Sequence, residues 1–237
     1  MYKQLLYLIL SLGLMSNAHA DTIVQDNFTE DPSNPMQMSV HHAGNSMQAL
    51  CPPASVGDDS DAPCPIVIKN KAGKTLTIQG LNADEANTAE VVWLANSAVQ
   101  VIVSLQQTDV MYSILINFKA MQIQYITNLF TADPSKDLMA LANAGDKAKI
   151  IVTRMSNLTQ GLLIDTPKNA MSPNAYESVH YSSYFDNQGS FILRFINKKN
   201  VISTQVIPIN PSQFAPINPS DIGTFDIKTL NANSGTS

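Results

Sequence analysis

Charge is scarce in this sequence of 237 residues: 14% are Asp, Glu, Lys or Arg, with 14 basic against 19 acidic side chains and a net charge of −5. Without a basic excess the chain lacks the electrostatic footprint of a nucleic-acid binder. The 10 glycines exclude a collagen-like repeat, and so little charge is not typical of a coiled coil. Two cysteines exclude a disulfide-dense miniprotein.

Motifs for catalysis and metal binding are also missing. The sequence contains no Gly-x-Ser-x-Gly, His-Glu-x-x-His, Walker A or Gly-x-Gly-x-x-Gly motif. His41 and His42 are adjacent, and in an extended segment they point in opposite directions, so we do not expect them to chelate a metal together. Asp58, Asp59 and Asp61 lack the glycine and the terminal glutamate of an EF-hand loop. The sequence therefore predicts no active site, no metal and no cofactor.

His180 is the one histidine for which a hydrolase stays open as an alternative. It lies in an aromatic stretch, Tyr176 to Phe185, that fits either core packing or a carbohydrate- or peptide-binding face. A general base needs an oriented carboxylate, and Glu177 and Asp186 are only its neighbours in sequence. A hydrogen-bonded histidine on a strand is the more common case. Catalysis would require His180 to meet a carboxylate beside a Ser or Tyr.

The first residues are typical of a signal peptide. Lys3 gives a positive start, and Leu5 to Met15 is an apolar run too short to span a bilayer as a helix. Ala18 and Ala20 occupy the two positions that signal peptidase reads, which predicts cleavage after Ala20 and disfavours an uncleaved anchor. Since Asp21 is not a cysteine, we do not expect a lipoprotein. The predicted location is the periplasm or beyond.

Export changes the interpretation of the two cysteines. Cys51 and Cys64 enclose a loop rich in Pro and Asp, and in an oxidising compartment such a pair is expected to form a disulfide. Closing a loop of this size stabilises a fold by on the order of 3 kcal/mol in the chain-entropy model. Their spacing fits neither a zinc ribbon nor a redox motif.

The N-terminal part of the mature chain is predicted to contain a leader and a hairpin. Residues 21–50 have no sustained hydrophobic period and are predicted to form an extended or disordered leader. Two β-branched runs, Pro65 to Lys69 and Lys74 to Ile78, flank a Gly-containing turn and predict a β-hairpin.

The centre is predicted to be helical. Apolar residues follow three-four spacing over Val91 to Leu105 and over Met111 to Leu129, as two helices or as one long helix. Two shorter helices are expected, one at Ser135 to Ala144 and one that begins at Asp146 and ends at Gly161. Together they predict a helical bundle. Trp93, the one tryptophan, is expected to pack within the first of these helices rather than to act in a site.

The C-terminal part is predicted to be β-rich. Strands are expected in Tyr176 to Phe185, Phe191 to Ile196 and Val201 to Ile209. Residues 208–237 repeat a Pro-Ile-Asn-Pro-Ser segment and read as a flexible tail. The predicted fold class is therefore α+β, with one globular domain over 51–207.

Uncharged amides supply the polarity that charge does not. The sequence has 21 Asn and 14 Gln. Five of them interrupt the apolar central segments and argue against membrane spans: Asn96, Gln100, Asn117, Gln122 and Gln124. Amide-rich, weakly charged faces suit protein–protein contact, and the base composition of the genome is an equally good explanation.

These features together give a resemblance in style. The Ala-x-Ala signal, the Pro/Asn leader, the cysteine pair, the Asn/Gln-rich middle and the tail loosely resemble exported, IcmX-like periplasmic components of Dot/Icm-type type IV secretion systems of Legionella and Coxiella. The resemblance implies a periplasmic factor of a secretion apparatus without enzymatic activity, and it assigns no functional residue. The predicted function is thus an exported accessory or assembly component that contacts envelope or secretion-system proteins. The alternative is a secreted virulence-type or ligand-binding protein released from the cell.

Overall fold

The computed structural model describes residues 24–27, 29–31, 34–50, 64–81, 89–94, 98–104, 111–180 and 182–226. These residues form antiparallel β-sheets, with one short α-helix, α3 (Ala175–Ser178), and two 3-10 turns, η2 (Pro211–Gln213) and η3 (Pro219–Asp221). The α+β prediction with a central helical bundle is therefore wrong, because the central segments are strands.

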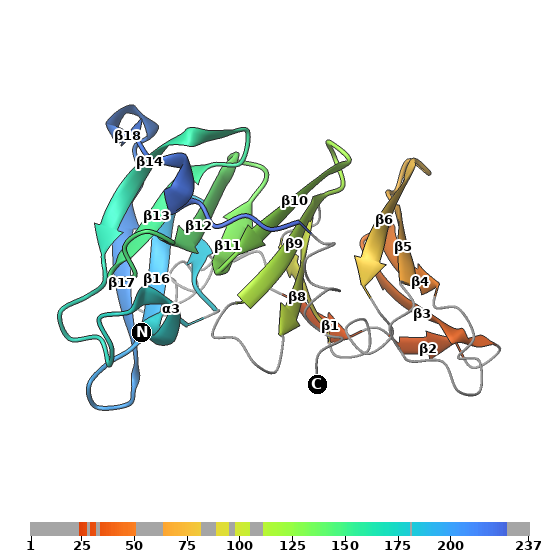
Figure 1. Cartoon of the computed structure of the whole chain (residues 1–237), viewed down its shortest axis with the longest axis horizontal. Coiled ribbons are helices and arrows are strands. Elements are labelled where there is room, and N and C mark those ends of the chain that lie inside the picture. The colour runs from red at the N-terminus through yellow and green to blue at the C-terminus, as the bar shows by residue number, and fades with distance from the viewer. Residues whose placement is uncertain are drawn as a thin grey trace, which may run out of the picture.

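Four sheets make up the molecule, and Figure 1 shows the first at one end, the second in the middle, and the third and fourth at the other end. The first sheet contains β2 (Thr29–Asp31), β3 (Asn34–His42), β4 (Asn45–Leu50), β5 (Cys64–Lys69) and β6 (Thr75–Leu81). The second contains, in spatial order, β1 (Val24–Asn27), β7 (Glu90–Leu94), β8 (Ala98–Ser104), β9 (Met111–Asn117) and β10 (Gln122–Thr127).

The third and fourth sheets come from the C-terminal half of the chain. The third contains β11 (Leu129–Asp133), β12 (Leu138–Ala142), β13 (Lys149–Arg154), β14 (Asn157–Asp165) and the short β18 (Ala215–Pro216). The fourth contains β15 (Tyr184–Phe185), β16 (Ser190–Ile196) and β17 (Ile202–Pro208).

Three apolar layers hold the sheets together. The first and second sheets share a core that includes Met47, Ile66, Ile68, Val91, Trp93, Val101 and Ile114. The second and third sheets share Val92, Leu94, Leu115, Met139, Leu141 and Ile151. The third and fourth share Phe130, Ala140, Val152, Phe191, Leu193 and Phe195, and α3 adds Ala175 to this layer. The inner strands of the second and third sheets, β7 to β9 and β11 to β13, are consequently buried on both faces, whereas β10 and β14 are partly exposed.

Burial on both faces explains why the central helices were predicted. Side chains alternate between the two faces of a strand, so Val91 packs toward the first sheet and Val92 toward the third. Both positions must then be apolar, and the strand becomes a continuous apolar run whose residues also satisfy three-four spacing. The β-branched content of β7 and β8 favours a strand over a helix.

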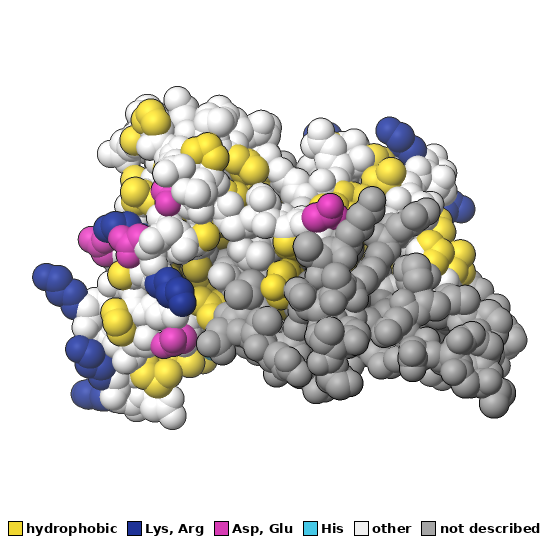
Figure 2. Space-filling view, in the orientation of Figure 1, with side chains coloured by type: hydrophobic (Ala, Val, Ile, Leu, Met, Phe, Trp, Pro, Cys, Tyr) yellow, Lys and Arg dark blue, Asp and Glu magenta, His cyan; other side chains and the backbone are white. Residues whose placement is uncertain are grey.

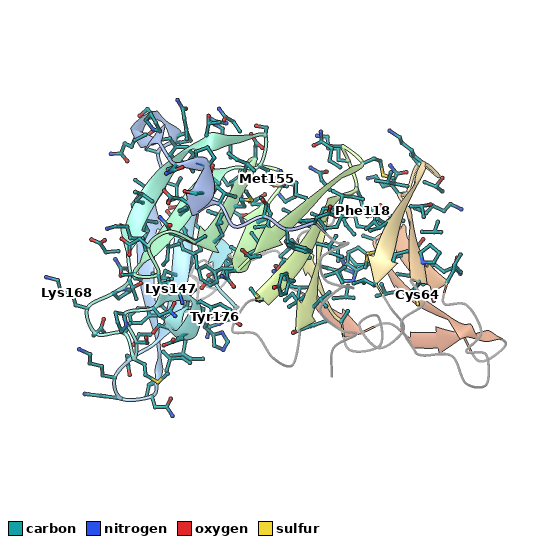
Figure 3. The ribbon with its side chains drawn as sticks, viewed as in Figure 1. Cys64, Phe118, Lys147, Met155, Lys168 and Tyr176 are labelled. Atoms are coloured by element: carbon teal, nitrogen blue, oxygen red, sulfur yellow. The ribbon has the colours of Figure 1, made fainter. Side chains whose placement is uncertain are left out.

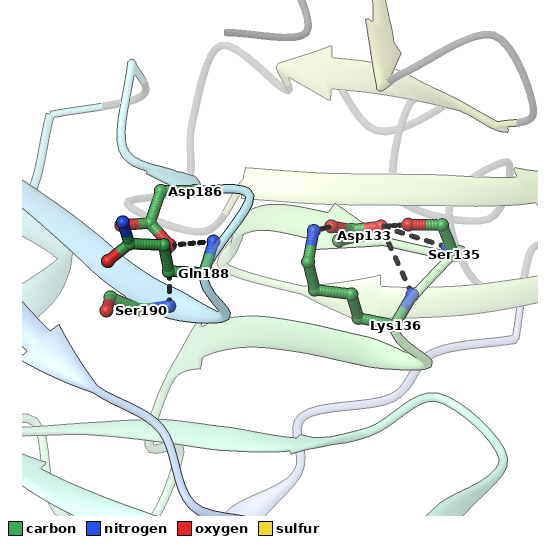
Figure 4. A network of polar contacts seen from close by, with 6 residues as sticks. All are labelled: Asp133, Ser135, Lys136, Asp186, Gln188 and Ser190. Carbon is green, nitrogen blue, oxygen red and sulfur yellow. Dashed lines mark hydrogen bonds and ion pairs between the residues drawn. The ribbon is translucent and has the colours of Figure 1, made fainter. Parts of the chain in front are cut away.

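The two shorter predicted helices are also strands and turns. Ser135 to Ala144 covers a turn and β12, and Asp146 to Gly161 covers β13, a turn and the start of β14. Asp133 organises the first of these turns, because its Oδ1 accepts hydrogen bonds from the Ser135 N–H at 2.9 Å and the Ser135 hydroxyl at 2.6 Å, and its Oδ2 pairs with Lys136 (Figure 4). Burial would raise the pKa of this carboxyl, but the hydrogen bonds from Lys136 and Ser135 and the charge of Lys136 outweigh it and lower the pKa.

The predicted hairpin is confirmed. β5 and β6 pair antiparallel with Ile66 opposite Ile78 and Lys69 opposite Thr75. Gly73 has φ 81° in the turn, a conformation that side chains with a Cβ rarely adopt. The Oδ1 of Asn70 accepts from the N–H of Lys74 at 2.9 Å and closes the turn.

Segments expected to be a leader and a tail belong to the sheets. Within residues 21–50 the described residues form β1 to β4, and Met47 and Ala49 of β4 are fully buried. Within the tail, the N–H of Thr127 in β10 donates to Gly223 O at 2.8 Å, and Ile217 and Ile222 are buried in the layer between the second and third sheets. The described residues of both segments pair with or pack against a sheet, although each segment contains prolines and has only a weak hydrophobic period.

Many asparagines cap turns in this fold. The Oδ1 of Asn117 accepts from the N–H of Lys119 at 3.0 Å, that of Asn143 from Gly145 at 2.7 Å, and that of Asn210 from Ser212 at 3.0 Å. Gln100 has a different role: it is buried and its Nε2 donates to Leu129 O at 2.9 Å, which ties the second sheet to the third. Turn chemistry is thus one structural reason for the high amide content.

As for the bilayer, no helix within the described parts of the chain has the length and apolar character that a membrane span requires.

Candidate interaction surface

The outer face of the fourth sheet carries the best candidate site. Phe191, Leu193 and Phe195 of β16 point inward and pack against the third sheet. Because side chains alternate along a strand, Ile192, Arg194 and Ile196 of β16 lie on the opposite, outer face, where Arg194 and Ile196 are partly exposed and Ile192 is buried.

Residues from both neighbours of β16 extend this face into three rows. Tyr184 and Val206 flank Ile192, so the first row is apolar. Thr204 lies opposite Arg194, whose carbonyl accepts from the N–H of His180 at 2.7 Å. Ile202 lies opposite Ile196, whose carbonyl accepts from the N–H of Met171 at 2.8 Å. We call the nine residues of these rows the outer face: Met171, His180, Tyr184, Ile192, Arg194, Ile196, Ile202, Thr204 and Val206.

Exposed apolar side chains concentrate at this end of the molecule. Met171 is 51% exposed, Ile202 42% and Val206 60%, and Val201, which precedes β17, is 57% exposed. Elsewhere among the described residues, only Leu50 and Leu163 are large apolar side chains with comparable exposure. Grouped exposed apolar side chains of this kind are typical of a contact surface.

Basic side chains accompany the apolar rows although the whole chain is acidic. Arg194 lies in the middle row, and Lys198 and Lys199 occupy the turn between β16 and β17. Figure 2 shows Lys and Arg side chains projecting, with apolar side chains between them, at the end formed by the third and fourth sheets, and Figure 3 places Lys168 there. Glu177 and Asp186 are the acidic residues nearest in sequence to β15, and Figure 2 shows Asp and Glu side chains among the basic ones at this end of the molecule.

The surroundings of His180 on this face favour its neutral imidazole form. Its burial and then the nearby charge of Arg194 lower its pKa. Its Nδ1 lies 2.6 Å from the Ser182 hydroxyl and accepts from the Ser182 N–H at 3.2 Å, which leaves the ring proton of the neutral form on Nε2.

The carboxylates proposed to orient His180 make other hydrogen bonds. Glu177 Oε1 accepts from the side-chain amide of Asn174 at 2.9 Å. The Oδ1 of Asp186 accepts from the N–H groups of Gln188 at 2.9 Å and Ser190 at 2.8 Å and closes the turn before β16 (Figure 4). In these contacts neither Glu177 nor Asp186 bonds to the ring of His180.

The other sequence candidates are not brought into one site. His41 is exposed on β3, whereas the ring of His42 lies 5.0 Å from that of Trp93. No group of three or more His, Cys, Asp or Glu side chains in the described ranges could hold a metal. Asp58, Asp59 and Asp61 lie outside the described residues.

The predicted disulfide and signal cleavage stay predictions. Cys64 is fully buried at the first position of β5, and the described residues contain no free cysteine. Its expected partner, Cys51, lies outside the described residues, as do Ala18 and Ala20.

Sequence reasoning predicted β16 and β17 but not the face itself. The expected strand Tyr176 to Phe185 is wrong in its first part, because residues 176–178 belong to α3 and only Tyr184–Phe185 forms a strand, β15. The period of Phe191 to Ile196 fitted a helix as well as a strand, and Met171 lay in no predicted element. The register that sets Met171 beside Ile196 and Ile196 opposite Ile202 was the missing information.

No protein-family model matches this chain, and no curated protein sequence matches it.

Proposed function

We propose that this protein is an exported accessory or assembly component of a bacterial envelope machine of the type IV secretion kind, and that it acts through protein–protein contacts without catalysis. The observation that supports this function best is the outer face of the fourth sheet, where two apolar rows flank a basic middle row. The signal sequence and the cysteine pair support a periplasmic location.

The chemistry of the outer face suggests what its partner presents. Met171, Ile202 and Val206 offer exposed apolar area at one end of the molecule. Arg194 and the lysines of the following turn favour carboxylates at the rim of the contact. The partner is accordingly an envelope protein with an apolar patch bordered by acidic residues.

Capture of partners from a periplasmic extract tests this function. The mature chain from Asp21, carrying Met171→Asp, is expected to retain at least about tenfold less partner than the unaltered chain, because the new carboxylate must be desolvated and repels acidic residues on the partner. Thr77→Asp is the matched control, since Thr77 is exposed on β6 at the opposite end of the molecule.

Equal capture by the Met171→Asp variant would contradict the assignment of the outer face. Finding the protein mainly in culture supernatant, with no envelope partner, would support the alternative, a released virulence-type or ligand-binding protein.

A further inference from the structure

The outer edge of β17 presents backbone N–H and C=O groups that pair with no described strand. β17 pairs with β16 on one side, and among the described residues no strand pairs with its other side. The N–H of Asn197 donates to Val201 O at 2.9 Å, so the backbone groups of Val201 point toward β16. Hydrogen-bonded pairs alternate along an antiparallel ladder, and Ser203, Gln205 and Ile207 therefore also bond to β16. Ile202, Thr204 and Val206 direct their N–H and C=O groups away from the sheet.

This edge lacks the usual protections of an edge strand. No charged residue occurs between residues 200 and 220, and the register of β17 with β16 runs without a shift. Pro208 blocks only the last position of the strand. Gln205 is exposed although it lies on the inner side, which shows that β17 stands at the rim of the third sheet. An uncharged, regular edge of this length is a template for pairing with another strand.

Two other edge strands of the fold, β10 and β14, are partly covered. The C-terminal segment runs beside β10, where Ile126 bridges to Thr224. β18 pairs with part of the outer side of β14, with Gly161 opposite Ala215. The outer edge of β17, which pairs with no described strand, is therefore a candidate site for pairing with a further strand.

We propose that β17 pairs antiparallel with β17 of a second copy of this chain, about a two-fold axis at Thr204. This register sets Thr204 opposite Thr204 and each Ile202 opposite the Val206 of the other copy. The outward N–H and C=O groups of these three residues then make six intermolecular hydrogen bonds. Thr–Thr and apolar cross-strand pairs are both favourable, and the two outer faces join in one six-stranded sheet.

Charge selects the antiparallel arrangement. Lys198 and Lys199 lie just before β17. An antiparallel pair places the lysines of the two copies at opposite ends of the joined strands, next to the uncharged residues after Pro208 of the other copy. A parallel pair would bring the four lysines together, and like charges at an interface are unfavourable.

Sedimentation equilibrium of the mature chain over a concentration series tests the dimer. The weight-average mass is expected to rise toward twice that of the chain, with a dissociation constant on the order of micromolar for so small an interface. Thr204→Pro removes an N–H that faces outward, so the ladder to β16 is kept while two of the six intermolecular bonds are lost. We expect at least about tenfold weaker dimerisation.

Thr204→Lys gives a second test that needs no backbone change, because it places two ammonium groups opposite each other at the axis. It should weaken the dimer to a similar extent, while Thr77→Lys on β6 should not. A monomer at every concentration, or a dimer that both Thr204 variants leave intact, would overturn the proposal. The inference does not rest on the proposed function: Thr204→Pro tests the edge, and Met171→Asp tests the outer face in partner capture.

Discussion

Replacing either Val91 or Val92 with Asp is expected to unfold the mature protein at room temperature. Val91 is fully buried against the first sheet and Val92 is 6% exposed against the third. A carboxylate in either layer has no partner, and its desolvation costs several kcal/mol. That penalty is comparable with the whole stability of a domain, about 5–15 kcal/mol. Urea denaturation followed by circular dichroism measures the loss.

If aspartate at either of two consecutive positions unfolds the protein, both faces of that strand are buried. Thr77→Asp is the control, because Thr77 is exposed on the first sheet and should change the free energy of unfolding by no more than about 0.5 kcal/mol. If one of the two valine variants were as stable as the control, the second sheet would have a solvent face and the layered arrangement would be wrong.

Truncating Trp93 is expected to cost about 3–5 kcal/mol in the free energy of unfolding. Trp93 is fully buried in the layer between the first and second sheets, its ring centroid lying 5.6 Å from that of Phe118 in a stacked arrangement. Trp93→Ala leaves a cavity between two sheets that cannot close without moving both. Thermal and urea unfolding of the variant measure the effect.

Trp93→Phe separates packing from polarity at the same position. The Nε1 of Trp93 is buried and has no hydrogen-bond partner among the described residues. Phenylalanine removes this N–H together with part of the ring, so we expect a loss of less than half that of the alanine variant. A phenylalanine variant as unstable as the alanine variant would show that the N–H is satisfied in the folded protein.

The sequence predicted strands correctly where an explicit turn joins or precedes them. β5 and β6 surround a Gly-containing turn, and β16 and β17 follow the turn closed by Asp186. It failed over β7 to β13, because residues such as Val91 and Val92 face two different apolar layers and leave no alternation to detect.

The leader shows a signal that was present but not used. Met36, Met38 and Val40 alternate with Gln37 and Ser39 along β3, which is the period of a strand with one buried face. Pro32 and Pro35 weighed against a strand, although β3 itself begins beside them and pairs in register from Gln37 onward.

The outer face could not have been found from the sequence alone. His180 and the aromatic stretch were singled out as candidates, yet Met171, Arg194 and Ile202 meet only through the pairing of segments up to some thirty residues apart. Side-chain type identified two members of the face, His180 and Tyr184, and register supplied the others.

Site-specific photocrosslinking in the producing cell tests most directly whether the fourth sheet is the contact surface of this protein. A photoreactive residue at position 171, on the outer face and away from the β17 edge, is expected to give a discrete adduct with another protein. The same residue at position 77, on the first sheet, should give none. Adducts from position 77 with none from position 171 would contradict the account.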